Sequence, residues 1–169
     1  MMKSKAVIRM RFGWAGILSL LLLLAGCGAE ASVAVLPDPV PDQLMAGAKD
    51  GVAVTVLKSG TGGERTVITY SIENRRAEPI GYGGYAALEK LEPDGWHGVI
   101  YSDAVFYRNP GFRDFGQVLA PGGKKTQQLD TAELGVNLVP GRYRVVKTAV
   151  ADGSSGMEIS VASEFGIGE

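Results

Sequence analysis

The sequence predicts an all-β domain with the architecture of a β-sandwich, preceded by an export signal and a proline-containing linker. From residue 51 onward, apolar and polar residues alternate in short runs that turn-forming residues separate, which is typical of half-buried strands. No run has the convincing apolar spacing of an amphipathic helix. The 169 residues include one cysteine, so an intrachain disulfide is excluded and the fold must rest on its hydrophobic core.

The first 26 residues have the features of a secretory signal peptide. Residues 1–11 carry four basic side chains and no acidic one, and an apolar run, Trp14–Leu24, follows. This run is too short to cross a bilayer core, which takes roughly 20 residues. It matches the apolar region of a cleaved export signal.

Leu24, Ala25, Gly26 and Cys27 come at the end of this signal. The four residues resemble the lipobox of bacterial lipoproteins. The resemblance implies a diacylglyceryl group on the Cys27 thiol and cleavage of the chain just before it. Two acyl chains on one residue give stable anchoring. We therefore expect a lipid-anchored protein on the extracytoplasmic face of the cell membrane.

Residues 27–50 are expected to form the lipidated N-terminus and a flexible tether. Pro37, Pro39 and Pro41 alternate with other residues, a pattern that disfavours helix and central strand and favours extended polyproline II. At about 3.1 Å per residue, such a tether would hold the following domain up to roughly 70 Å from the membrane. Residues 51–169 then form the predicted domain.

That domain is expected to contain seven or eight short strands. Pro93-Asp94-Gly95 lies between two of them and predicts a hairpin. The glycine-rich stretch Gly81–Tyr85 is followed by a strand pattern, whereas a phosphate-binding loop needs a helix there, so we interpret it as a bulge or an irregular crossing between strands. The expected strands are 52–57, 67–73, 86–92, 96–101, 116–119, 124–129, 142–150 and 157–165.

Tyr143 and Val145 follow the turn Pro140-Gly141. This arrangement is similar to the tyrosine corner before strand F of immunoglobulin-like sandwiches, with an apolar residue where antibody domains carry cysteine. The sequence therefore favours an immunoglobulin-like β-sandwich.

A series of short motifs across residues 51–165 strengthens this prediction by their order and spacing. They are Ile72-Glu73-Asn74, Tyr82-Gly83-Gly84-Tyr85, Leu88-Glu89-Lys90, Asp94-Gly95-Trp96, Leu119-Ala120-Pro121-Gly122 and Pro140-Gly141-Arg142-Tyr143-Arg144-Val145. Together they resemble the bacterial immunoglobulin-like domain found in secreted and lipoprotein chains of Gram-positive bacteria. The resemblance implies no catalytic residue and no cofactor. The layout is also similar to a bacterial proteinase-inhibitor family with a related sandwich, so an inhibitor at the cell surface is the alternative function.

The sequence offers little for catalysis or metal binding. His97 is the single histidine and Cys27 the single thiol, so a nucleophile–histidine pair would have to use His97, which we interpret as an exposed residue at a strand end. A His and Cys metal site is excluded by counting. Carboxylates such as Glu89 and Glu92 are interpreted as solvated. We expect no enzyme activity, no cofactor and no metal.

The charge of the mature chain excludes two further classes of partner. The signal peptide holds four of the 17 basic residues and none of the 18 acidic ones. The remainder therefore carries 13 basic and 18 acidic residues, a net charge of −5. An acidic domain without basic runs is a poor nucleic-acid binder. It is not drawn to anionic lipid by charge either, so attachment must come from the lipid on the cysteine.

One segment, residues 101–115, combines aromatic and arginine side chains around Asn109-Pro110-Gly111. Such residues on a loop suit a recognition surface for an extracytoplasmic protein partner, and an inhibitor would use Asn109–Arg113. Alternatively, the aromatic residues cap the core where the chain crosses between sheets, and both interpretations stay open. The candidate residues are Tyr101, Phe106, Tyr107, Arg108, Phe112 and Arg113.

Overall fold

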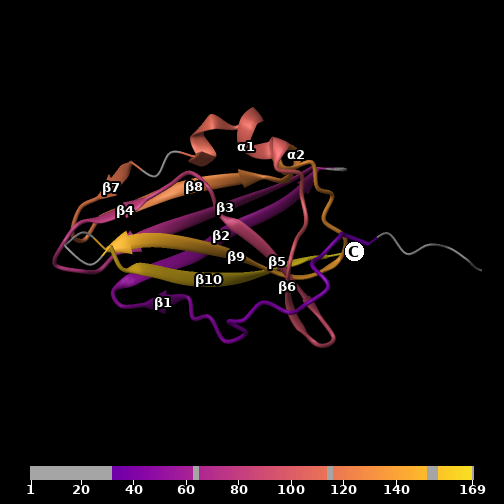
Figure 1. The fold of residues 1–169 in the computed structure, drawn as a ribbon, viewed down its shortest axis with the longest axis horizontal. Coiled ribbons are helices and arrows are strands. Elements are labelled where there is room, and N and C mark those ends of the chain that lie inside the picture. Colours follow the sequence, from indigo (N-terminus) through magenta and orange to yellow (C-terminus); the bar gives the residue numbers. More distant parts are fainter. Residues whose placement is uncertain (1–31, 63–64, 114–115, 152–155, 169) are drawn as a thin grey trace, which may run out of the picture. The chain divides into compact units, whose positions relative to one another are not determined.

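The structure is a computed structural model that describes residues 32–62, 65–113, 116–151 and 156–168. The signal peptide and the lipobox with Cys27 lie outside these ranges. The described residues form two β-sheets that face each other as a sandwich (Figure 1). This confirms the expected all-β, immunoglobulin-like fold. All eight expected strands are present, and two short ones, β1 (Ala48–Lys49) and β4 (Ile80–Tyr82), add to them.

The first sheet has the strand order β1-β2-β3-β8 and is antiparallel throughout. Its strands beyond β1 are β2 (Val52–Gly62), β3 (Arg65–Asn74) and β8 (Lys124–Asp130). Asp50 and Gly51, with φ of 48° and 78°, join β1 to β2. Positive φ at both positions is what a two-residue type I′ hairpin needs, and Asp-Gly is a favoured pair for it.

The second sheet is built around β9 (Gly141–Ala151). On one side β9 pairs with β10 (Glu158–Ile167) over ten residues. On its other side lie β5 (Ala87–Glu92) and β4, each pairing with a different part of β9. Between these two strands the chain leaves the ladder at residues 83–86. The irregular crossing expected from the glycine-rich stretch is therefore confirmed.

Two outer strands complete this sheet. The expected hairpin is present, because β6 (Gly95–Gly98) pairs with β5. β7 (Gln117–Leu119) pairs with β4, and a turn at residues 120–123 then carries the chain to β8 in the other sheet.

The core lies between the two sheets. The buried side chains include Val54, Ile68, Tyr70 and Ile72 from the first sheet and Tyr143, Val145, Ala149, Ile159 and Val161 from the second. Full burial of an aliphatic side chain of this size contributes about 1.5–3 kcal/mol. The core can thus carry the fold without a disulfide.

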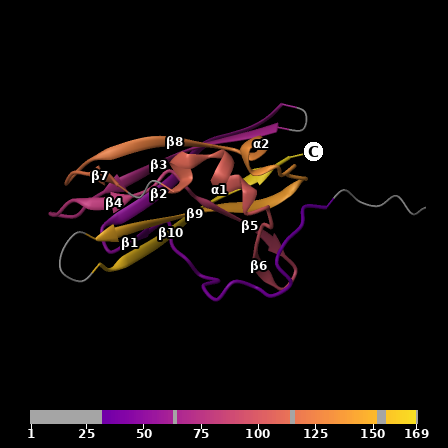
Figure 2. The same cartoon turned by 45° about the horizontal axis from the view of Figure 1, so that its top comes forward.

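In the described part of the chain, three short helices join the strands: α1 (Ala104–Arg108), the 3-10 helix η2 (Pro110–Arg113) and α2 (Thr131–Leu134). α2 is capped at its start, where the Asp130 side chain accepts a hydrogen bond from the Ala132 amide, as N-cap residues do. Figure 2 shows α1 on the same side of the molecule as α2. Among the described residues, no helix is long and apolar enough to cross a membrane.

Residues 32–49 differ from the free tether expected for this part of the chain. This segment, here called the strap, runs antiparallel to β6, with hydrogen bonds from Leu36 N to Gly98 O at 2.8 Å and from Ile100 N to Ala34 O at 2.9 Å. It then passes to β10 and enters β1 (Figure 1). The alternating prolines do exclude a helix. However, the open edge of β6 offers backbone groups that an extended chain can pair with.

Candidate functional site

The predicted recognition segment packs onto the end of the sandwich through a cluster of aromatic rings. Tyr85, from the crossing between β4 and β5, lies 5.2 Å from Phe106 and 5.8 Å from Phe112, measured between ring centroids. Tyr101 joins them at 6.3 Å from Tyr85. These separations and tilted or edge-on angles suit aromatic pairs. Phe112 is 8% exposed, so three of the six candidate residues cap the core.

Two other candidate residues face solvent. The Tyr107 side chain on α1 is 76% exposed, and Arg108 is exposed as well. The side chain of Arg113 lies outside the described part. The Asn109 amide donates to the carbonyl oxygens of Val105 at 3.1 Å and Glu133 at 3.3 Å, which ties the end of α1 to α2. The structure thus brings together an exposed tyrosine and arginine on a supported helical turn.

The same segment does not form the loop that an inhibitor would require. Residues Pro110–Arg113 are a 3-10 helix, and Phe112 is turned into the aromatic cluster. A protease cleft, in contrast, accepts an exposed and extended chain. Asn109–Arg113 therefore lacks the extended conformation expected of an inhibitory loop, and the inhibitor alternative stays a prediction.

The cluster rests on a close approach between two chain segments. A Cβ atom added to Gly84 would lie 2.5 Å from the carbonyl oxygen of Gly111, a contact that real Cβ atoms do not make. Glycine at this position lets the crossing lie directly against η2. The sequence interpretation identified the crossing but not this contact, because it joins residues far apart in the chain.

Lys147 holds the crossing from inside the sandwich. Its ammonium group donates to the carbonyl oxygens of Gly83 at 2.5 Å and Tyr85 at 2.6 Å. It lies about 6 Å from the ring centroids of Tyr70 and Tyr82, within the range of cation–π attraction. Burial lowers the pKa of Lys147 to about 8. Sequence analysis missed this role, although Lys147 stands in the same alternating row as Tyr143 and Val145, both buried.

His97 is buried, not exposed as expected. Its side chain is about 5% exposed, and the strap, which pairs with the edge of β6, brings the Leu36 carbonyl onto the ring. Nδ1 lies 2.7 Å from the Leu36 carbonyl oxygen and Nε2 lies 2.9 Å from Asp94 Oδ1. The Leu36 carbonyl and then the Asp94 carboxylate raise the pKa of His97, since both accept hydrogen bonds from the protonated ring. Both ring nitrogens therefore have structural partners.

Glu89 is also buried, which corrects its interpretation as a solvated carboxylate. Arg144, which is 2% exposed, donates from Nε to Glu89 Oε2 at 2.5 Å. The guanidinium also donates to the carbonyl oxygens of Asp42 at 2.6 Å and Gln43 at 3.3 Å. It lies 4.7 Å from the Trp96 ring centroid. This pair joins β5, β9, β6 and the strap, while Glu92 pairs with Lys90.

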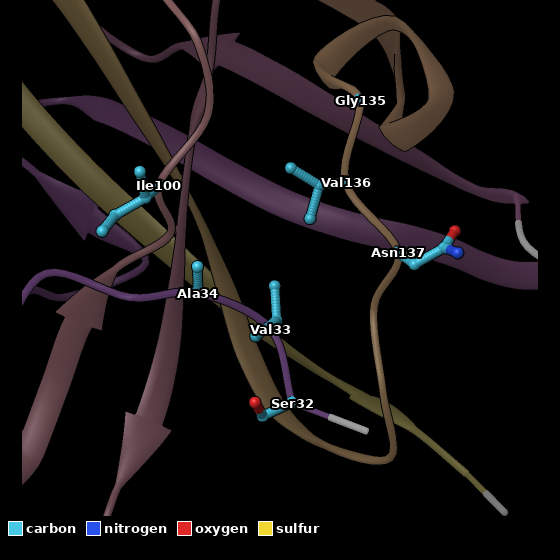
Figure 3. Close-up of a pocket in the computed structure, with 7 residues that line it drawn as sticks. All are labelled: Ser32, Val33, Ala34, Ile100, Gly135, Val136 and Asn137. Atoms are coloured by element: carbon cyan, nitrogen blue, oxygen red, sulfur yellow. The ribbon is translucent and has the colours of Figure 1, made fainter. Parts of the chain in front are cut away.

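A shallow pocket of ≈ 180 Å³ lies where the strap begins (Figure 3). It is smaller than the 300–1,000 Å³ or so of typical small-molecule sites. Its lining carries no charged side chain and consists of Ser32, Val33, Ala34, Ile100, Gly135, Val136 and Asn137. Within the described ranges, no three His, Cys, Asp or Glu residues gather to hold a metal ion. We therefore interpret the pocket as a seam between the strap and the loop after α2.

The turn before β9 defines the class of this domain. The Tyr143 hydroxyl donates to the carbonyl oxygen of Val139, four residues upstream, at 2.8 Å. This is the tyrosine corner of immunoglobulin-like sandwiches, so the sequence prediction is confirmed. The family model for the bacterial Ig-like domain matches residues 48–165. The chain belongs to this family.

Solved structures share only a slight likeness with the chain. An X-ray structure of a Northeast Structural Genomics Consortium target is 10% identical, with a TM-score of 0.39 over 72% of this chain and 88% of that one. Pseudomonas fluorescens alkylpurine DNA glycosylase AlkC, bound to DNA with an abasic site analog, is 16% identical, with a TM-score of 0.32 over 72% of this chain. Beta-glucosidase from Kluyveromyces marxianus in complex with glucose is 17% identical, with a TM-score of 0.29 over 68% of it.

The matches cover 31% of the glycosylase chain and 14% of the glucosidase chain. What those proteins bind therefore says nothing of this one. A search of curated proteins gives no match.

Proposed function

We propose that the chain is a lipoprotein of the cell surface whose immunoglobulin-like domain binds an extracytoplasmic protein through the exposed face of α1. The observation that carries the binding role is the exposure of Tyr107 and Arg108 on a helical turn that packs against the aromatic cluster. Tyrosine and arginine are enriched among residues that dominate protein interfaces. The sequence Leu24-Ala25-Gly26-Cys27 behind an export signal supports the lipid anchor.

The contacts that hold α1 in place favour a binding role for this segment over a role as a simple connection between strands. Phe106 of α1 packs its ring against those of Tyr85 and Phe112, and Asn109 links the helix to α2. A surface fixed before binding loses little conformational entropy when its partner arrives. Tyr107 and Arg108 are therefore presented in a defined arrangement.

The proposed role is non-catalytic. His97 and Glu89 are the side chains best suited to acid–base catalysis. Both are engaged in hydrogen bonds that hold the strap and the strands together. A general base must be able to reach a proton on the substrate, and buried groups with structural partners do not meet this condition.

The anchor is tested with Cys27→Ala in the producing cell. We expect the variant to lose fatty-acid labelling and to leave the membrane fraction or remain uncleaved. Ser32→Ala, five residues further on, keeps the four lipobox residues and should be labelled and anchored as before. Unchanged labelling of Cys27→Ala would refute the anchor.

The binding surface is tested by crosslinking and capture on native cells, with the full lipidated chain as bait. We expect the Tyr107→Ala/Arg108→Ala variant to lose a partner that the unmodified chain retains. Val118→Ala is the matched control, because Val118 is an exposed residue on β7, away from α1. If the double variant captures the same partner as the control, α1 is not the binding face.

A further inference from the structure

We propose that the strap is a short leash that turns one end of the sandwich toward the lipid bilayer. This inference rests on the proposed lipid anchor at Cys27. We call the two ends of the domain the proximal end, at Gly141 where β9 begins, and the distal end, at Ala151 where β9 finishes. The strap starts beside Val136 and Asn137 (Figure 3), in the loop that leads into Gly141.

Backbone pairing holds the first part of the strap. Besides the two hydrogen bonds to Gly98 and Ile100, Val40 N donates to Trp96 O at 2.8 Å. The Gln43 side chain adds two contacts to the same strand, accepting from Trp96 N at 2.7 Å and donating to Trp96 O at 3.1 Å. Val33 is buried in the core cluster. The strap is thus docked along nearly its whole length.

Two buried cationic or titratable side chains of the domain bind the strap through its carbonyl groups. Arg144 donates to Asp42 and Gln43, and His97 faces Leu36. If the strap left the domain, both side chains would lose their hydrogen bonds to its carbonyl groups, which they make in a buried environment. Hydrogen bonds from charged donors are the stronger ones, so the docked state is favoured.

The length of the remaining chain then limits the position of the domain. Five residue steps separate Cys27 from Ser32, and they span at most about 18 Å even when fully extended. A free segment from Cys27 to Lys49 would span about 80 Å. With the strap docked, the lipid must lie close to the proximal end.

The seam where the strap begins suits contact with a neutral lipid surface. The seam beside Ser32 has no charged residue in its lining, and the apolar Ile100 side chain there is 45% exposed. The net charge of −5 gives the domain no electrostatic attraction to anionic lipid. The leash, and not charge, therefore sets the orientation.

The test uses the full lipidated protein in phosphatidylcholine vesicles that carry an acceptor dye on the lipid headgroup. A donor dye is attached through Asn137→Cys at the proximal end or Val118→Cys at the distal end. Both positions are exposed, and lipid occupies the natural cysteine. We expect stronger energy transfer from the proximal dye than from the distal one. Equal transfer from both positions would overturn the leash.

Two changes lengthen the leash in different ways. Val33→Asp with Gln43→Ala weakens the docking, while insertion of a flexible glycine–serine segment between Ala31 and Ser32 leaves the docked strap untouched. Both should lower energy transfer from the proximal dye toward the distal value. Leu44→Ala is the matched control on the strap, because Leu44 is 94% exposed, and it should change nothing. Unaltered transfer after the insertion would contradict the proposal.

Flotation separates the two hypotheses. A protein that does not float with the vesicles lacks its anchor, and both proposals then fail. A protein that floats but shows equal transfer from the two dyes keeps the anchor and refutes the leash alone.

Discussion

The hydroxyl group of Tyr143 donates a hydrogen bond to the carbonyl oxygen of Val139 at 2.8 Å. The ring of the same residue is fully buried and stacks on Phe165. One side chain therefore fills the core and also fixes the turn that leads into β9, the central strand of the second sheet.

Replacing Tyr143 with Phe should lower the free energy of unfolding by about 1–2 kcal/mol, because it leaves the Val139 carbonyl without its donor while the ring remains. Chemical denaturation measures this loss. Tyr70→Phe is the control, since the Tyr70 hydroxyl makes a longer contact, 3.3 Å to Gln127 Oε1, and should cost less. Equal losses in the two variants would count against a special role for the corner.

Replacing Arg144 with Met should destabilise the protein by about 3–5 kcal/mol, because it leaves the Glu89 carboxylate buried without its partner. The double variant Arg144→Met/Glu89→Met should be more stable than the single one, since no isolated charge remains. Denaturation curves of the two variants test this order. Arg142→Met is a matched control, because its bond to Glu164 is exposed and should cost less than about 1 kcal/mol.

Stability should fall as the pH rises through the pKa of His97. The folded state raises this pKa above its ordinary value, so the contribution is complete below about pH 6.5, the value for an unfolded chain. It is lost as the folded protein releases the proton. The difference in unfolding free energy between the native protein and His97→Asn, measured by denaturation, should shrink as the pH rises above about 6.5.

Asp94→Asn removes the negative charge beside the His97 ring, so it should lower the folded-state pKa of His97 and move this loss of stability to lower pH. A difference from His97→Asn that stays constant as the pH rises would show that the histidine does not titrate differently in the folded state.

Lys147 should have the opposite pH dependence. Its folded-state pKa is about 8, against 10.5 for an ordinary lysine, a difference that corresponds to about 3 kcal/mol. Between these two values the unfolded chain holds more protons, so stability from this group rises with pH. The stability of the native protein relative to Lys147→Met should therefore grow between about pH 8 and about pH 10. A difference in unfolding free energy that does not change with pH would refute this assignment.

The strands and the tyrosine corner could be predicted because their signals are local. Alternation at every second residue places Val54 and Ile72 in the core, and a turn followed by Tyr143 marks the start of a strand. The composition of the glycine-rich stretch Gly81–Tyr85 likewise predicts an interruption of the sheet. Such patterns depend only on residues close together in the chain, so they can be recognised without knowing the tertiary fold.

The strap and the buried charges could not be predicted in this way. Pro37, Pro39 and Pro41 exclude a helix, but nothing near them shows that β6 has an open edge. Arg144 and Glu89 lie 55 positions apart and become a buried pair only when β5 pairs with β9. His97 was expected at the surface because the segment that covers it lies some 60 residues earlier in the chain.

The strap also covers an edge strand at which two copies of the protein could otherwise pair. An uncovered edge strand presents unpaired N–H and C=O groups that can join the edge of another molecule and start aggregation. Residues 34–40 occupy such groups through three backbone hydrogen bonds, two to β6 and one to Ile100 just beyond it. The proposed lipid anchor would concentrate many copies in one membrane plane, where collisions between edges are frequent. The docked strap therefore closes the β6 edge to pairing with a neighbouring molecule.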